Sequence, residues 1–329
     1  MDLRILGEVG ERNLIDVMMR HLTPMPKTPM PFWDDVSAVT IGRGRAAILK
    51  ADMLVWKTDV PQGMTPFQAA RKAVVMNFSD LGSKGVQPAA FLVSLGLPRG
   101  LTVDFVEEMA RGFEAGAREY DAYVVGGDTS EAGEVIIGGM AFGVAEEKAL
   151  MKREGARPGD ILATTGGFGN TAAAFKILLE GYEAPPELRA SLVDSVYMPR
   201  ARVKEGTALA RSGSISASMD SSDGLAMSLH DLSRSSDVGF RVERLPASPE
   251  ATRFAEMHGL DLSELVFYGG EEYELVLTVR PDAMNSARAA LKEVGRELIE
   301  LGRATGERRI VYYDGVEEKP LRSGYEHFK

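Results

Sequence analysis

The six residues Asp220-Ser221-Ser222-Asp223-Gly224-Leu225 place two carboxylates three positions apart, where a strand-like run gives way to a helical one. Two carboxylates about 4 Å apart repel each other by about 4 kcal/mol at an effective dielectric of about 20. A fold that keeps such a pair together needs a cation between them, and hard divalent metal ions prefer oxygen ligands of this kind. The structural alternative makes Asp220 a turn residue and Asp223 the N-cap of a helix.

Other acidic residues lie beside predicted strands and helices. They are Asp34 and Asp35 before the strand 36–41, Asp52 after an apolar run, Asp80 on a helix, and Asp128 in a glycine turn that closes a strand. Each has a structural alternative as a turn or cap residue, or, for Asp80, as the partner of Lys84 one helical turn later. Ligands in α/β folds bind at strand ends. Because five acidic sites in one cavity would repel one another without cations, their joint pattern predicts a metal-bound polyphosphate.

Two glycine-rich segments adjoin predicted strands. Gly166-Gly167-Phe168-Gly169-Asn170 joins a strand to a helix, where backbone N–H groups can receive a phosphate. No Walker A lysine follows it, and a tight strand-to-helix connection is the favoured interpretation. Gly269-Gly270-Glu271-Glu272 enters another strand, and its structural alternative is a bulge or turn with exposed glutamates.

Composition excludes several classes of function. The formal net charge of −10 argues against nucleic acid or an anionic membrane as a partner, although metal ions would still let the protein bind small phosphates. The absence of cysteine excludes disulfides, zinc–thiolate sites and cysteine nucleophiles, and the four histidines show no metal-ligand spacing. No apolar run is long enough to span a bilayer and no secretory pattern is present, so we expect a cytoplasmic protein.

Both halves of the chain mix strand-like and helical segments, which predicts an α+β or α/β fold of two domains. The polar, turn-rich segment 152–160 marks the predicted boundary, with domains at residues 1–150 and 151–329. Within the first, Thr65-Pro66 predicts the start of a helix that runs to about Ser83, and Thr102 predicts the start of another.

The chain carries these motifs in order: Asp34-Asp35, Lys50-Ala51-Asp52, Asn77-Phe78-Ser79-Asp80-Leu81-Gly82, Gly126-Gly127-Asp128-Thr129, Asp220-Ser221-Ser222-Asp223-Gly224-Leu225, Gly269-Gly270-Glu271-Glu272-Tyr273-Glu274-Leu275 and Gly324-Tyr325-Glu326-His327-Phe328. In order and spacing the series resembles the thiamine-monophosphate kinase family, a branch of the aminoimidazole ribonucleotide synthetase superfamily. The resemblance covers nearly the whole chain.

This resemblance implies a two-domain aminoimidazole ribonucleotide synthetase-like fold that forms a homodimer through its N-terminal strands. It also implies in-line transfer of the γ-phosphoryl group of ATP to thiamine monophosphate, assisted by Mg²⁺. By position, the magnesium ligands would be Asp35, Asp52, Asp80, Asp128, Asp220 and Asp223. The nucleotide contacts would be Asp35, Lys50, Ala51, Gly127, Arg153 and Ser222, the substrate contacts Asp59, Glu271 and Tyr325, and the catalytic residues Asp223, Asp128 and Arg153.

The chain departs from the family pattern at several positions. Lys50-Ala51 replaces a pair of hydroxyl residues, and we hypothesise that Lys50 contacts a phosphate directly. Trp33 replaces a glycine, and Ser221 and Glu272 replace an aliphatic residue and an aspartate. Asp59 replaces a histidine. An aspartate at this position favours binding of the cationic thiazolium ring, or it marks a paralogue with a different acceptor. In the structural alternative, Asp59 is a solvated acid in a loop.

Three functions remain open from the sequence. The first is the Mg²⁺- and ATP-dependent kinase, or a paralogue that uses a different phosphate-monoester acceptor. The second is a relative that uses ATP to activate an amide or carbonyl oxygen. The third is a non-enzymatic acidic protein that binds metal ions.

Overall fold

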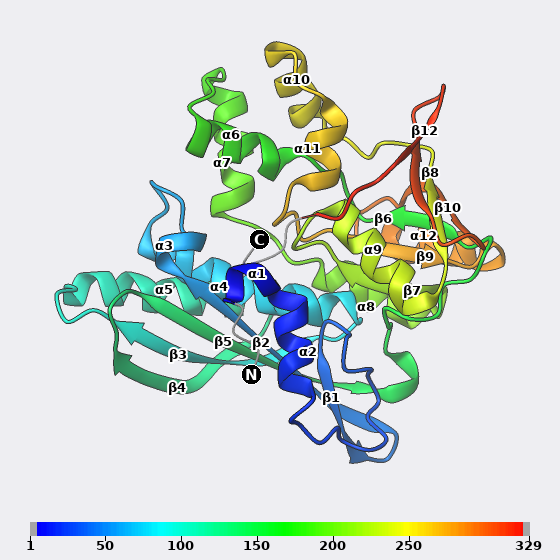
Figure 1. Cartoon of the computed structure of the whole chain (residues 1–329). Coiled ribbons are helices and arrows are strands. Elements are labelled where there is room, and N and C mark those ends of the chain that lie inside the picture. The colour runs from blue at the N-terminus through cyan, green and yellow to red at the C-terminus, as the bar shows by residue number, and fades with distance from the viewer. Residues whose placement is uncertain (1–4, 325–329) are drawn as a thin grey trace.

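The computed structural model describes residues 5–324, which form two sheets with helices packed on them (Figure 1). The first sheet has the strand order β1-β2-β5-β3-β4. Its neighbouring strands are antiparallel except for β3 and β4, which run parallel. The strands are β1 (Ser37–Gly42), β2 (Arg45–Val55), β3 (Pro88–Leu97), β4 (Tyr123–Glu131) and β5 (Ile136–Glu146).

The second sheet has the order β12-β11-β8-β10-β6-β9-β7, and only β8 and β11 are parallel neighbours within it. Its strands are β6 (Ile161–Thr164), β7 (Ile215–Asp220), β8 (Gly239–Val242), β9 (Leu275–Val279), β10 (Ile299–Thr305), β11 (Ile310–Tyr313) and β12 (Glu318–Pro320). Two mixed sheets with helices confirm the predicted fold class.

The helices cover the sheets in layers. They are α1 (Leu6–Val9), α2 (Glu11–Met19), α3 (Trp56–Asp59), α4 (Pro66–Ser83), α5 (Val103–Arg118), α6 (Asn170–Glu180), α7 (Pro186–Tyr197), α8 (Val203–Ser212), α9 (Leu225–Ser236), α10 (Pro249–His258), α11 (Leu262–Tyr268) and α12 (Met284–Glu293), with 3₁₀ turns at Glu147–Ala149 and Pro281–Ala283. Helices α4 and α5 cover one face of the first sheet. Helix α9 packs on one face of the second sheet, and α8 and α12 pack on the other.

Helices α6, α7, α10 and α11 surround an apolar cluster of their own, at the top of Figure 1. No helix was predicted from the sequence at α7 or α11. No helix in the described part of the chain combines the length and the apolar content needed to cross a membrane.

Helix α4 is the element that joins the two sheets. It begins at a capping box, in which the Gln68 N–H donates to the Thr65 hydroxyl and the Thr65 N–H donates to the Gln68 side chain. The predicted N-terminus is therefore confirmed. From Ala69 onward almost every residue is buried, because α4 lies between the first sheet, α8 and β7. The approach to α8 is close: a Cβ on Gly206 would lie 1.8 Å from the Gly82 carbonyl oxygen.

The segment Gly126–Thr129 differs from its prediction as a turn that closes a strand. It lies inside β4, which continues to Glu131, because these residues pair with β3 in parallel register. Glycine suits this position, since a Cβ on Gly127 would lie 1.8 Å from the Val93 carbonyl oxygen. The glycines of this segment predicted a turn, whereas pairing with β3 makes the segment part of a strand.

The face of the first sheet opposite α4 and α5 carries exposed apolar side chains. Along β2, Leu54 is buried whereas Met53 is 60% exposed, and along β5, Ala141 is buried whereas Met140 is 43% exposed. This alternation is the period of a strand with one covered face. Val125 on β4 is 60% exposed on the same sheet. The monomer therefore leaves an apolar sheet surface in contact with solvent.

Candidate active site

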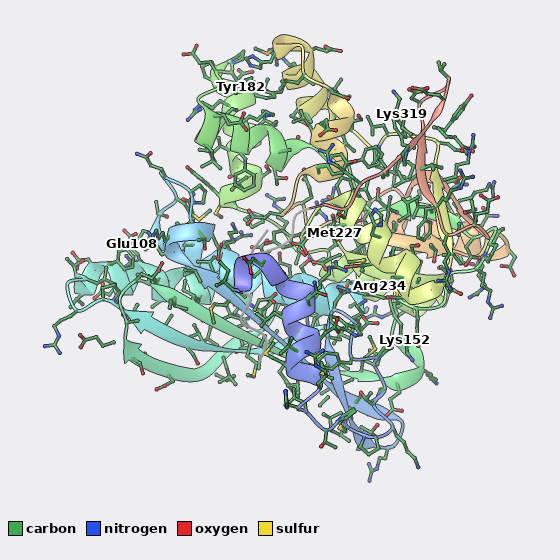
Figure 2. All side chains as sticks on the ribbon, viewed as in Figure 1. Glu108, Lys152, Tyr182, Met227, Arg234 and Lys319 are labelled. Atoms are coloured by element: carbon green, nitrogen blue, oxygen red, sulfur yellow. The ribbon has the colours of Figure 1, made fainter. Side chains whose placement is uncertain are left out.

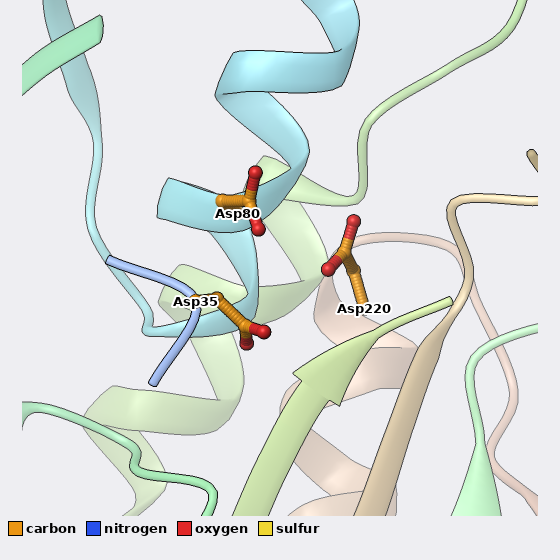
Figure 3. A group of neighbouring side chains, drawn as sticks. All are labelled: Asp35, Asp80 and Asp220. Atoms are coloured by element: carbon orange, nitrogen blue, oxygen red, sulfur yellow. The ribbon is translucent and has the colours of Figure 1, made fainter. Parts of the chain in front are cut away.

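Three buried carboxylates converge where α4 meets the second sheet. Asp35 comes from the loop before β1, Asp80 from the last turns of α4, and Asp220 from the end of β7 (Figure 3). One oxygen of each lies within 4.8 Å of the others. Each residue is at most 6% exposed. Residues that are far apart in sequence therefore form a single pocket of hard oxygen atoms.

Asp34 and Asp35 are held by two cationic side chains. The Lys84 ammonium lies 2.7 Å from Asp34 and 2.6 Å from Asp35, and it donates to the Ser218 carbonyl oxygen at 2.6 Å. The Arg153 guanidinium binds the other oxygen of Asp35. Burial alone would raise the pKa of Asp35, but Arg153 and Lys84 outweigh it and lower that pKa well below its usual range.

Within residues 5–324, no cationic side chain forms an ion pair with Asp220. Its carboxylate accepts a hydrogen bond of 2.6 Å from the Ser79 hydroxyl, one residue before Asp80 on α4. Burial and the neighbouring Asp35 raise the pKa of Asp220 to about 6. Burial also raises the pKa of Asp80, and Lys50 only partly opposes this. Burial and the repulsion between neighbouring carboxylates thus disfavour the ionised forms, and a cation between the carboxylates would offset both effects.

Lys50 on β2 connects the trio to a fourth carboxylate. Its ammonium lies 3.0 Å from Asp52 and 3.1 Å from Asp80. Burial opposes the charge of Lys50, but Asp80 and Asp52 outweigh it and raise its pKa above the usual value. The Asp52 N–H donates to the Asn77 side chain on α4, which fixes this part of β2 against the helix.

The two acidic motifs of the second sheet are joined by their backbones. The Glu271 N–H donates to the Ser222 carbonyl oxygen at 2.6 Å, and the Tyr273 N–H donates to that of Ser221 at 2.9 Å. Glu271 and Tyr273 have positive φ angles of 65° and 53°, which non-glycine residues rarely adopt. Strained backbone of this kind is concentrated at functional sites.

Glu271 is paired with a buried lysine of the other half of the chain. Lys72 on α4, 2% exposed, donates to one Glu271 oxygen at 2.7 Å and to the Asp59 carbonyl oxygen at 3.2 Å. The second Glu271 oxygen is buried and has no hydrogen-bond partner in the part of the chain that the structure describes. Lys72 therefore brings two predicted substrate residues, Asp59 and Glu271, to the same place.

The start of α6 is occupied by a carboxylate of the protein itself. Glu272 accepts hydrogen bonds from the N–H groups of Gly169 at 2.7 Å and Thr171 at 3.1 Å. Burial raises the pKa of Glu272 to about 7. The favoured interpretation of the Gly166–Asn170 segment, a tight connection, fits this arrangement, and the phosphate alternative does not.

Helix α2 packs beside the site against α9. Arg12 donates to Asp231 at 2.7 Å and to the Met227 sulfur at 3.0 Å, and Figure 2 shows Met227 and Arg234 on α9 next to α2. Arg153 also reaches Asp231 at 3.5 Å. A cavity of about 330 Å³ adjoins this contact; its lining includes Trp33, Asp34, Arg153 and Arg234.

The remaining predicted site residues lie outside the trio. Asp128, Gly127 and Ala51 are exposed on the first sheet, and Ser222 and Asp223 are exposed in the loop before α9. Helix α9 begins at Leu225 with Gly224 at its N-cap position, so the structural alternative for Asp223 is wrong. Tyr325 lies outside the described residues.

Several residues around the trio were not assigned from sequence. Lys84, predicted as the structural partner of Asp80, instead binds Asp34 and Asp35, while Asp80 binds Lys50. Ser79 and Lys72 were assigned no role from the sequence. Their contacts join segments far apart in sequence, which local spacing does not encode.

The donor set fits a hard divalent cation such as Mg²⁺. The trio offers only carboxylate oxygens, and those ions prefer such ligands. Among the described residues, the buried hydroxyl of Ser221, which follows Asp220 in sequence, has no hydrogen-bond partner. No cysteine is present in the chain and no histidine is part of the trio, which disfavours softer metals.

Comparison with known proteins identifies relatives along most of the chain. Residues 33–145 match the family described as AIR synthase related protein, N-terminal domain, and residues 157–315 match its C-terminal domain. The thiamine-monophosphate kinase of Pyrococcus horikoshii is 35% identical over 86% of this chain and 86% of its own length. That of Pyrococcus abyssi is 36% identical over 87% of both chains.

A solved structure has the same fold. The protein described as "AaThiL complexed with AMPPCP and TMP" superposes with a TM-score of 0.86 at 27% identity, over 99% of both chains. The likeness therefore includes both sheets and the helices between them.

Proposed function

The chain belongs to the AIR synthase related family, where its relatives are thiamine-monophosphate kinases, and we propose that it transfers the γ-phosphoryl group of ATP to thiamine monophosphate. The products are thiamine diphosphate and ADP. The solved relative that carries AMPPCP and TMP supports both substrates. The observation that carries the proposal within this chain is the convergence of Asp35, Asp80 and Asp220.

We assign these carboxylates to Mg²⁺. The proposed ligands are Asp35, Asp52, Asp80, Asp128, Asp220 and Asp223. When bound, Mg²⁺ neutralises the phosphate oxygens between which the transfer occurs. The pKa of Asp220, raised by burial and by the neighbouring Asp35, supports a cation at this place.

The chemistry of the acceptor fits a site without a general base. A phosphate monoester is anionic at neutral pH, so its oxygen needs no deprotonation before it attacks. The obstacle is the approach of two anions, which positioned positive charge relieves. Arg153 supplies such a charge: Asp35 and Asp231 orient its guanidinium, which faces the cavity beside Trp33. We propose Lys50, Ala51, Gly127 and Ser222 as further nucleotide contacts.

We propose that Asp59, Glu271 and Tyr325 contact the acceptor. Among the described residues, no donor bonds to the second oxygen of Glu271. The positive charge of a thiazolium ring would offset the cost of burying that carboxylate oxygen. Lys72 holds the other Glu271 oxygen and fixes the orientation of the carboxylate. The strained backbone at Glu271 supports a functional role for this loop.

The same proposal includes a homodimer formed through the first sheet. The exposed apolar face with Met53, Val125 and Met140 supports this surface as the interface. A second copy that covers it would bury side chains that the monomer leaves in water.

Incubation of the purified protein with Mg²⁺, γ-labelled ATP and a panel of phosphate monoesters tests the function. We expect the label in thiamine diphosphate and no transfer when thiamine monophosphate is omitted. Asp220→Asn serves as the site variant, and Asp237→Asn, an exposed aspartate at the end of α9, serves as the matched control.

Other outcomes identify the alternatives. Label in another monoester would indicate a kinase paralogue. Phosphate release that depends on an amide substrate would indicate an amide-activating enzyme. Cation binding without nucleotide turnover would leave only a metal-binding protein and contradict the proposal.

A further inference from the structure

Lys50 lies where a cation is needed between two elements of the site. Its ammonium contacts Asp52 on its own strand and Asp80 on α4, at 3.0 and 3.1 Å. Strand alternation places Lys50 and Asp52 on the covered face of β2 and Ala51 on the other. Asp80 also belongs to the buried trio, so the same carboxylate serves the lysine and the proposed metal site.

The charges of the site balance only in part. Five carboxylates, from Asp34, Asp35, Asp52, Asp80 and Asp220, face three cationic side chains, from Lys50, Lys84 and Arg153. With all five ionised, two negative charges remain, which is the charge that one divalent ion neutralises. A divalent ion between Asp52 and Asp80 would displace Lys50 or be repelled by it.

We propose that Lys50 is a tethered cation that takes the place of one divalent ion between Asp52 and Asp80. Before nucleotide binds, divalent cations then occupy the Asp35–Asp80–Asp220 trio but not the Asp52–Asp80 pair. Lys50 thereby sets how many ions the protein holds and keeps β2 attached to α4 in their absence. This inference rests on the proposed metal role of the trio and is independent of the acceptor.

The nucleotide contact proposed for Lys50 concerns the complex with ATP, whereas the tethered-cation role concerns the protein before nucleotide binds. An ammonium has three donors, and the two carboxylates engage two of them. The two roles differ in what removal of the charge does to cation binding without nucleotide. Only the tethered-cation role predicts that a new site opens.

The test measures Mn²⁺ binding to the full-length protein without nucleotide, by electron paramagnetic resonance of free Mn²⁺. We expect Lys50→Met to bind one more ion per chain than the unmodified protein. Lys50→Arg keeps the charge and should leave the number unchanged. Lys148→Met removes an exposed lysine that pairs with Glu146 and serves as the matched control.

A double variant makes the assignment specific. Lys50→Met with Asp52→Asn should lose the additional ion, because one of its two carboxylates is gone. Circular dichroism checks that each variant is folded, and Lys50→Gln provides a second uncharged side chain should Lys50→Met unfold.

An unchanged number of bound ions in folded Lys50→Met or Lys50→Gln would overturn the inference. A loss of affinity for a non-hydrolysable ATP analogue without a change in Mn²⁺ number would also overturn it, because phosphate contact would then be the role of Lys50 on its own. Kinase turnover is measured separately. An additional ion in a protein without turnover would support the inference while contradicting the proposed function.

Discussion

At the scale of single residues, the site depends on carboxylates whose charge is either compensated within the fold or left for a ligand. Asp34 belongs to the first group, because Lys84 binds it. Asp35 is compensated by Lys84 and Arg153 and is also one of the three carboxylates proposed to hold the metal ion. Asp220 belongs to the second, since its carboxylate accepts from the Ser79 hydroxyl without an ion pair among the described residues, and its pKa is raised to about 6. Asp223, exposed in the adjoining loop, is close in sequence to Asp220 but is not one of the buried trio.

Asp223→Asn tests whether this exposed carboxylate acts in catalysis. We expect kcat to fall by about 100-fold or more, because a charge that would stabilise the transferring phosphoryl group is lost while the shape is kept. Steady-state kinetics at saturating Mg²⁺ and ATP measures the effect, and circular dichroism confirms the fold. Turnover close to that of the unmodified protein would remove Asp223 from the proposed metal ligands.

Lys84→Met tests the buried ion cluster. Lys84 is fully buried, and its loss leaves Asp34 and Asp35 with an uncompensated charge. We expect the free energy of unfolding in urea at pH 7.5 to fall by about 3–5 kcal/mol. Lys176→Met, which removes the half-buried partner of the exposed Glu180 on α6, should change it by less than about 1 kcal/mol. Equal effects of the two variants would contradict the role of Lys84.

At the scale of elements, α4 and α6 show how helix termini position the site. Helix α4 begins at an N-cap that is readable from Thr65-Pro66 and ends beside Asp35 and Asp220. Helix α6 begins where Glu272 accepts from two of its first N–H groups. Unlike Thr65, Glu272 is distant in sequence, so the cap of α6 exists only in the folded protein.

Glu272→Gln tests this distant cap through pH. The pKa of Glu272 rises from 4.5 to about 7 on folding, so the folded protein holds this proton more tightly than the unfolded chain. The stability that protonated Glu272 contributes is complete below about pH 4.5 and is lost as the pH rises through 7. Glutamine keeps an acceptor oxygen and carries no charge. We therefore expect the variant to gain about 1–2 kcal/mol in unfolding free energy at pH 8 and almost nothing at pH 4.5.

Glu272→Leu is the matched control for that measurement, since it removes both acceptor and charge and should destabilise the protein at both pH values. A gain for Glu272→Gln that does not depend on pH would show that burial does not shift this carboxyl group.

At the scale of the whole molecule, the exposed face of the first sheet is the feature that the monomer does not explain. Met140→Glu places a charge in the middle of that face, where Met140 is 43% exposed. If a second copy covers the face, the charge becomes buried and the dimer should dissociate, which analytical ultracentrifugation measures as a halved mass.

Val103→Glu provides the control, because Val103 is exposed on α5, which packs on the opposite face of the sheet. It should leave the mass unchanged. A dimer that persists in Met140→Glu, or an unmodified protein that is monomeric, would contradict the proposed interface.

Some features of this protein follow from local sequence patterns, and others follow only from the tertiary structure. Sequence patterns alone determined the mixed fold class, the N-caps of α4 and α5, the family and the acidic motifs, because periodicity, capping and motif order are local properties of the chain. They did not reveal that Gly126–Thr129 continues a strand or that α7 and α11 exist.

Only the tertiary structure decided which carboxylates lie close together and which cationic side chains form ion pairs with them. Local spacing paired Asp80 with Lys84, whereas folding pairs Lys84 with Asp34 and Asp35 and gives Asp80 to Lys50. The physical reason is the burial of α4 between the two sheets. That packing brings β2, β7 and the loop before β1 to one helix, and it removes the water that would otherwise satisfy each charge separately.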